Sequence, residues 1–179
     1  DVICTIGDST FLHTGIQGLM NAVYNGANIT VVILDNRITA MTGHQPNPNT
    51  GLTACGVESL PVSLDAICRA CGVGFVETVD PYDITGMMHV LRQAQARRGV
   101  KVIIAKQQCV ITARRAGIKR GRYMVDNEAC TACGTCIRFG CPAIEKVADD
   151  KAWINDLCSG CGVCAQICPS GAILREGKR

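Results

Sequence analysis

Short runs of β-branched and aliphatic residues alternate with amphipathic stretches along the first 112 residues. The apolar runs predict buried strands over residues 2–6, 30–34, 73–79 and 100–105. Apolar residues at helical spacing fall between these runs and predict helices over residues 14–24, 64–71 and 84–97. Strands that alternate with helices predict an α/β domain built on a parallel sheet with both faces covered.

Cysteines recur at fixed spacing in the rest of the chain, residues 124–179. The pattern Cys-x2-Cys-x2-Cys, followed by Cys-Pro, occurs twice about 28 residues apart. Bacterial-type ferredoxins with two [4Fe-4S] clusters share this spacing, and in them the cysteine before proline binds the other cluster. Zinc more often takes its ligands as two pairs. We therefore predict one cluster on Cys130, Cys133, Cys136 and Cys168 and a second on Cys158, Cys161, Cys164 and Cys141.

Short apolar segments after each Cys-Pro, at residues 143–144 and 172–174, predict the strands of a small α+β module whose fold depends on cluster assembly. The glycines of the two cysteine runs would let backbone N–H groups approach the sulfurs; these are Gly134, Gly160 and Gly162.

A basic segment separates the two parts of the chain. Residues 113–122 carry five positive charges and no negative one, with two glycines and no apolar periodicity. We therefore expect residues 113–123 to be a linker between a domain at 1–112 and a domain at 124–179. A solvated connector, or a docking strip for an acidic redox partner or a phosphorylated substrate, would account for the charge.

Composition narrows the function classes. Hydrophobic residues make up 47% of the 179 residues, which excludes global disorder, and the 4% of aromatic residues disfavours a protein that stacks nucleic-acid bases. No apolar run has the length of a membrane span, and no secretory signal is visible. Thirteen cysteines in such a chain favour metal-bound thiols in a reducing cytoplasm over disulfides. We expect the five cysteines outside the repeat to be buried in the core: Cys4, Cys55, Cys68, Cys71 and Cys109.

Polar residues follow the first two predicted strands. Asp8 comes directly after the first strand, and Asp35 and Asn36 follow the second. Because ligands bind at the carboxyl ends of parallel strands, Asp8 and Asn36 converge if these strands are neighbours. Their oxygens suit Mg²⁺, with water and a phosphate completing the octahedron. Gly7 lets the chain turn closely under a phosphate, and the following helix offers N–H groups to it.

These strand-end residues resemble the thiamine diphosphate motif, Gly-Asp-Gly, then about 25 to 30 residues, then Asn-Asn. Here the motif is Gly7-Asp8-Ser9 and Asp35-Asn36, with Ser9 replacing the third glycine and Asp35 the first asparagine. The wider strings, residues 7–16 and 33–46, are similar to the 2-oxoacid:ferredoxin oxidoreductases, and most of all to their indolepyruvate-type large subunits. The resemblance covers nearly the whole chain.

The resemblance implies a site for thiamine diphosphate and Mg²⁺. Asp8, the Asn36 side chain and the Ile38 carbonyl would bind the metal, and the diphosphate would lie over the turn formed by Gly7, Asp8, Ser9 and Thr10. His13 and His44 follow the two motif turns. Each suits either a structural hydrogen bond or a catalytic contact with cofactor or substrate.

The resemblance also implies an activity, the oxidative decarboxylation of an arylpyruvate such as indolepyruvate with coenzyme A, which delivers electrons to ferredoxin. Such enzymes need a pyrimidine-binding domain and a smaller β subunit. We expect this chain to be the C-terminal part of a larger subunit, inactive or nearly so alone, without nucleic-acid or membrane partners. Two alternatives stay open: an electron-transfer module with a vestigial thiamine fold, and a related enzyme acting on pyruvate or 2-oxoglutarate.

Overall fold

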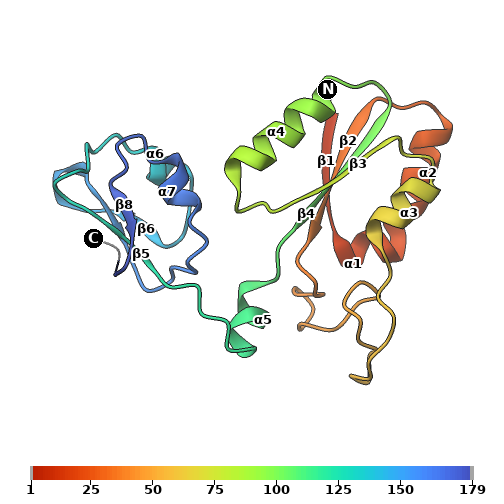
Figure 1. Ribbon diagram of the computed structural model, residues 1–179, viewed down its shortest axis with the longest axis horizontal. Coiled ribbons are helices and arrows are strands. Elements are labelled where there is room, and N and C mark those ends of the chain that lie inside the picture. Colours follow the sequence, from red (N-terminus) through yellow and green to blue (C-terminus); the bar gives the residue numbers. More distant parts are fainter. Residues whose placement is uncertain (1, 178–179) are drawn as a thin grey trace. The chain divides into compact units, whose positions relative to one another are not determined.

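Residues 2–177 are described by the computed structural model, and the chain divides into two units between Thr112 and Ala113 (Figure 1). The residues expected to form a linker, 113–123, therefore belong to the second unit. Helix α5, Val110–Arg115, covers the start of this segment, and strand β5, Tyr123–Val125, begins at its end. None of the helices in residues 2–177 combines the length and the apolar character needed to cross a bilayer.

The first unit contains a four-stranded parallel sheet in the order β1-β2-β4-β3. Its strands are β1 Val2–Gly7, β2 Ile29–Asp35, β3 Phe75–Val79 and β4 Val100–Lys106. Strands β1 and β2 are neighbours, and Gly7 lies opposite Leu34 in the register. The residues that follow the two strands therefore meet at the edge of the sheet formed by the carboxyl ends of its strands, as the sequence predicts.

Helices cover both faces of this sheet (Figure 1). On one face the core includes Leu19 of α2 (Ile16–Tyr24) and Cys68 of α3 (Leu64–Ala70). On the other face Ala94 of α4 (Ile84–Gln95) packs against β3 and β4. Successive residues of β4 point to opposite faces, which explains why the apolar run is continuous rather than alternating. The predicted α/β fold is confirmed, and each large core side chain contributes about 1.5–3 kcal/mol by its burial.

The helix after β1 begins six residues earlier than the pattern predicts. The chain is helical from Asp8 onward, through α1 (Asp8–Thr10) and a π-helical turn η1 (Phe11–Gly15) into α2. Polar Asp8 and Ser9 resemble a turn in the sequence, but here they form the first helical turn. A Cβ atom on Gly15 would lie 2.8 Å from Ile6 Cδ1, so glycine lets the helix pack closely on β1.

The second unit is a small α+β module. Strand β5 pairs antiparallel with β8 (Ile173–Arg175), and β6 (Ile144–Lys146) pairs antiparallel with β7 (Ala152–Ile154). Helices α6 (Thr135–Arg138) and α7 (Val163–Ile167) begin inside the two cysteine runs, and a 3-10 turn, η2, covers Ala148–Asp150. Its core mixes a few aliphatic side chains with cysteines. The predicted ferredoxin-like module is confirmed.

Three of the five scattered cysteines are not core residues, so that prediction is wrong for them. Cys4 is exposed because β1 is an edge strand of the described sheet, and Cys55 is exposed in the irregular segment between β2 and α3. Cys109 is half-buried beyond the end of β4. Cys68 is fully buried and Cys71 packs against the same core, as expected.

Candidate functional site

Two carboxylates are buried at the edge where β1 and β2 end. Asp8 is 2% exposed and Asp35 is 3% exposed. The backbone N–H of Ser9 donates to Asp8 Oδ1 (2.8 Å), and that of Arg37 donates to Asp35 Oδ1 (3.1 Å). Burial, and then the charge of Asp8, raise the pKa of Asp35 above its usual value. Two like charges destabilise the fold when they are buried, so a bound cation would stabilise this edge of the sheet.

A loop that the sequence pattern does not reveal supplies hydrogen-bond donors to both carboxylates. Asn47 Nδ2 donates to Asp8 Oδ2 (3.2 Å), and Asn49 Nδ2 donates to Asp35 Oδ1 (2.7 Å). Both asparagines are buried, and the Asn49 N–H donates to Asn47 Oδ1 (3.0 Å), which fixes the loop between them. The available signal was an asparagine pair spaced by Pro48 within a polar segment, which carries no periodicity.

The other two predicted metal ligands lie just beyond β2. The Asn36 side-chain oxygen accepts a hydrogen bond from the Ile38 N–H (3.0 Å), and the Asn36 carbonyl accepts one from the Cys109 N–H (3.0 Å). The loop is thus tied to the chain that leaves β4. One carboxylate, one amide and one carbonyl oxygen are the ligand types that Mg²⁺ takes, so Asp8, Asn36 and Ile38 fit that ion.

The predicted diphosphate turn is the start of the helix. Gly7 is extended (φ −71°, ψ 152°) and precedes the first helical turn. A Cβ atom on Gly7 would meet no atom within 4 Å, so the space beside it is open. Ser9 Oγ accepts a hydrogen bond from Thr39 Oγ1 (2.8 Å), which links this turn to the loop after β2. Thr10 is exposed at the same helix start. The N–H groups of such a turn favour a phosphate.

The two histidines differ in environment. His13 is exposed, and its Nδ1 lies 2.6 Å from the carbonyl oxygen of Ser9, so Nδ1 carries the proton and Nε2 is the basic nitrogen of the neutral ring. His44 is half-buried with left-handed backbone (φ 61°), which is strained for a residue other than glycine. Its Nε2 lies 4.0 Å from Cys109 Sγ, at the same edge of the sheet.

In the second unit, a cavity gathers the four cysteines predicted for the first cluster. Its walls include Cys130, Cys133, Cys136 and Cys168. Burial raises the pKa of Cys136, and the charges of Cys168 and Cys130 add to this increase. Within residues 2–177 no group of three or more His, Cys, Asp or Glu side chains could hold a single metal ion. Four cysteine thiolates are the ligands of a [4Fe-4S] cluster, and the four cysteines predicted for the first cluster line this one cavity.

Three of the cysteines predicted for the second cluster lie within electrostatic reach of the fourth, Cys164. Burial, followed by the charges of three neighbouring cysteines, raises the pKa of Cys164 to about 11; these neighbours are Cys161, Cys158 and Cys141. Cys141 belongs to the first cysteine run. In each predicted set, three cysteines of one run therefore lie near the fourth cysteine of the other, and the two ligand sets stay a prediction.

Comparison with protein families gives two matches. Residues 1–105 match the family described as "Thiamine pyrophosphate enzyme, C-terminal TPP binding domain". Residues 151–174 match the family described as "4Fe-4S binding domain". The predicted thiamine diphosphate and iron–sulfur cofactors agree with both matches.

Curated relatives extend the likeness to nearly the whole chain. It is 49% identical over 179 residues to indolepyruvate oxidoreductase subunit IorA of Archaeoglobus fulgidus, covering 96% of this chain and 28% of that protein. It is 44% identical over 186 residues to the IorA of Pyrococcus horikoshii, covering 99% of this chain and 28% of that protein. Pyruvate synthase subunit PorD of Methanothermobacter marburgensis is 41% identical over 56 residues, 31% of this chain and 65% of that protein.

These relatives confirm the resemblance to indolepyruvate-type large subunits that the motif residues indicate. The chain spans 28% of the length of the two IorA relatives. The family match covers more than half of the chain, and the buried strand-end residues lie within it. The chain thus belongs to the thiamine pyrophosphate enzymes, through their C-terminal TPP-binding domain, and carries a 4Fe-4S binding domain after it.

Proposed function

We propose that the protein is part of the large subunit of a thiamine diphosphate-dependent 2-oxoacid:ferredoxin oxidoreductase that acts on arylpyruvates of the indolepyruvate type. An arylpyruvate anion, coenzyme A and two oxidised ferredoxins would give an aryl-acetyl-CoA, CO₂, a proton and two reduced ferredoxins. The observation that carries the proposal is one chain that combines a thiamine pyrophosphate-binding domain with two sets of four cysteines. The names of the IorA relatives support the substrate class.

In this proposal the edge of the first sheet holds the cofactor. Asp8, the Asn36 side chain and the Ile38 carbonyl bind Mg²⁺, and the turn from Gly7 to Thr10 binds the diphosphate through its N–H groups. When bound, thiamine diphosphate supplies the electron sink that lets a 2-oxo acid lose CO₂. Asn47 keeps Asp8 oriented through its hydrogen bond to Oδ2.

In this proposal the histidines act on the substrate side of this edge. With Nδ1 bound to the Ser9 carbonyl, His13 offers Nε2 as a proton acceptor or, when protonated, as a donor. His44 lies in the loop after β2, where left-handed backbone keeps its ring beside Cys109. Both would contact the substrate or the cofactor and steer protons around the reacting carbonyl.

The second unit carries the electrons away. One decarboxylation releases two electrons, and each [4Fe-4S] cluster accepts one at a time. The clusters would be bound by the two cysteine sets described above and would pass electrons singly to ferredoxin. The rest of the enzyme would supply a pyrimidine-binding domain and a smaller β subunit, and the word "subunit" in the relatives' names supports a multi-subunit assembly.

The test uses the full-length large subunit purified anaerobically with its partner subunit. Rates are measured with coenzyme A and a viologen or ferredoxin acceptor on indolepyruvate, pyruvate and 2-oxoglutarate. We expect the highest kcat/KM on indolepyruvate, about eight irons per large subunit, and loss of oxoacid oxidation in Asp8→Ala. Higher kcat/KM on pyruvate or 2-oxoglutarate would reject the substrate class. No oxoacid oxidation in the wild type, together with electron transfer to ferredoxin that Asp8→Ala leaves unchanged, would mean that the thiamine fold is vestigial.

A further inference from the structure

The basic segment that precedes β5 lies directly against the second cysteine run. A Cβ atom on Gly160 would collide with the carbonyl oxygen of Gly121 and would lie 3.0 Å from Arg120 Cβ. A Cβ atom on Gly162 would lie 2.6 Å from the hydroxyl of Tyr123. Both glycines also have left-handed backbone. They therefore let residues 120–123 approach the loop that holds Cys158 and Cys161.

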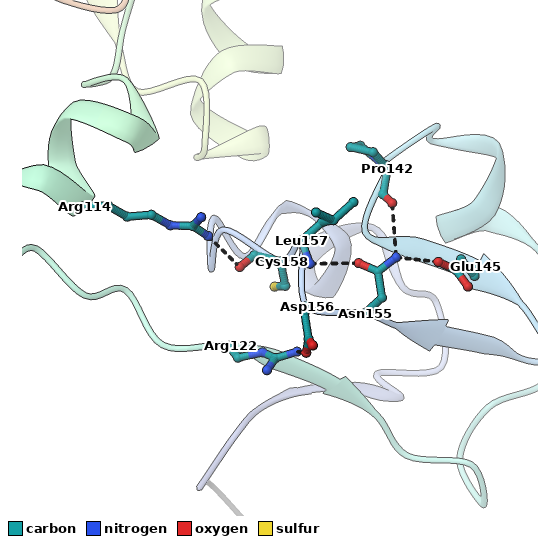
Figure 2. Close-up of polar contacts among 8 residues, drawn as sticks. All are labelled: Arg114, Arg122, Pro142, Glu145, Asn155, Asp156, Leu157 and Cys158. Atoms are coloured by element: carbon teal, nitrogen blue, oxygen red, sulfur yellow. Dashed lines mark hydrogen bonds and ion pairs between the residues drawn. The ribbon is translucent and has the colours of Figure 1, made fainter.

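Two arginines of this segment bind the same loop, as Figure 2 shows. Arg114 Nη2 donates to the carbonyl oxygen of Cys158 (3.2 Å), and Arg122 Nη2 donates to Asp156 Oδ1 (2.6 Å). The hydrogen bond to Asp156, and then the charges of Asp156, Glu176 and Cys158, raise the pKa of Arg122. The guanidinium group of Arg122 is thus within electrostatic reach of Cys158.

The rest of the loop is fixed from its other side (Figure 2). Asn155 Oδ1 accepts a hydrogen bond from the Leu157 N–H (2.9 Å), and Asn155 Nδ2 donates to Glu145 Oε1 (2.5 Å) and to the Pro142 carbonyl oxygen (3.4 Å). Pro142 follows Cys141, the fourth predicted ligand of the same cluster. The arginines therefore bind a loop that carries Cys158 and that is also hydrogen-bonded to the residue after Cys141.

The first cysteine run has different neighbours. Two acidic residues lie beside it: the Asp126 backbone carbonyl accepts a hydrogen bond from the Cys130 N–H, and Asp150 lines the cavity and pairs with Lys146. One arginine, Arg138, donates to the Cys133 carbonyl oxygen (3.1 Å). The second run instead has two arginines from a segment with five positive charges and no negative one, with Asp156, Glu145 and Glu176 as the nearby acids.

We propose that residues 113–122 are a positioning element for the second cluster, in which Arg114 and Arg122 hold the loop at Cys158 and their positive charge favours the reduced cluster. Reduction adds one electron and one negative charge to a [4Fe-4S] cluster, which nearby cations stabilise. The second cluster then has the higher reduction potential, and an electron on the first cluster passes to it. This inference rests on the proposed two-cluster arrangement.

The experiment is an anaerobic redox titration of the full-length holoenzyme, followed by electron paramagnetic resonance. We expect Arg122→Gln and Arg114→Gln each to make reduction of the higher-potential cluster about tenfold less favourable, which equals about 59 mV for a one-electron couple. Arg138→Gln should shift the reduction potential of the first cluster only, because Arg138 contacts the first cysteine run. Arg115→Gln is the matched control, because it removes one charge from the same segment and Arg115 is exposed. It should change the equilibrium constant for reduction of either cluster less than threefold.

Several results would overturn the inference: equal shifts of both clusters in Arg122→Gln, a shift of the lower-potential cluster, or a shift as large in Arg115→Gln. Arg122→Lys retains the charge, so its equilibrium constant for reducing the higher-potential cluster should stay within threefold of the wild-type value. A tenfold change in this constant would refute the electrostatic role. If Arg122→Gln loses iron, selective loss of one cluster supports the holding role, and loss of both refutes it. A wild-type holoenzyme with only one cluster would instead reject the proposed function, and this inference with it.

Discussion

The hydrogen bond between Asn49 and Asp35 gives the sharpest test of the buried edge. Asn49→Ala removes the 2.7 Å bond to a carboxylate that is 3% exposed, and Asp35 keeps one other donor on that oxygen, the Arg37 N–H. A hydrogen bond to a charged group contributes about 1.5–3 kcal/mol, and water has little access to replace it. We expect Asn49→Ala to lower the free energy of unfolding of the cofactor-free protein by about 2 kcal/mol.

The loss of stability caused by Asn49→Ala should depend on pH. Because burial and Asp8 raise the pKa of Asp35 above its value in the unfolded chain, ionised Asp35 lowers stability above that raised pKa. This penalty disappears as the pH falls through the raised pKa and Asp35 becomes protonated in the folded state. The Asn49 bond opposes the increase, as does the charge of Arg37. The effect of Asn49→Ala should therefore be full at neutral pH and smaller in acid.

Calorimetry of the apo protein measures this effect as a fall in melting temperature. The fall should be roughly 4–8 °C for each kcal/mol of lost stability in a domain of this size. Asp35→Asn is the companion variant, since it removes the charge and keeps an oxygen that Asn49 can donate to. In that background Asn49→Ala should cost only about 1 kcal/mol, the value of a neutral hydrogen bond. An equal cost in both backgrounds and at every pH would show that Asn49 acts through packing alone.

Three further outcomes follow from the same structure. Thiamine diphosphate with Mg²⁺, added at a hundredfold excess over the dissociation constant, should stabilise the cofactor-free wild-type enzyme by about 2.7 kcal/mol; chelation of the metal, or Asp8→Ala, should abolish this shift in calorimetry. Gly15→Ala should destabilise by about 1 kcal/mol in urea unfolding, because its Cβ would lie 3.0 Å from the buried Phe11 ring and 2.8 Å from Ile6 Cδ1. Burial raises the pKa of Cys68 to about 12, so iodoacetamide at pH 8 should alkylate exposed Cys55 at least tenfold faster, as peptide mass spectrometry would measure.

The parts of the fold that follow from local patterns were predictable. Apolar runs gave the strands of the parallel sheet, and two cysteine repeats indicated a module with shared ligand sets. The start of the first helix was not predictable from periodicity, because Asp8 and Ser9 favour turns and become helical only where Gly15 lets the helix pack on β1. The exposure of Cys4 follows from the place of β1 at the sheet edge, which the strand itself does not reveal.

Asn47 and Asn49 could not be found from the sequence for another reason. Their partners lie 39 and 14 residues away, and the segment that carries them forms neither helix nor strand. An asparagine in such a segment more often forms a local turn than a long-range bond. The contacts of the basic segment could not be found from the sequence either, because charge and glycine indicate a solvated linker, while these contacts with the second cysteine run depend on glycines about 40 residues further on.

The departure from the thiamine motif at Asp35 is itself informative. An asparagine there would need no charge partner, whereas Asp35 places a second buried carboxylate beside Asp8. Burying two like charges is costly unless hydrogen bonds or a cation offset the cost. Asn49 offsets part of it with a direct bond, and a divalent cation on Asp8 would offset more. A vestigial site would lose such a pair without penalty, since replacing either carboxylate by a neutral residue would stabilise the apo fold. The buried pair, with one asparagine bound to each carboxylate, therefore favours an edge that works with its cation bound.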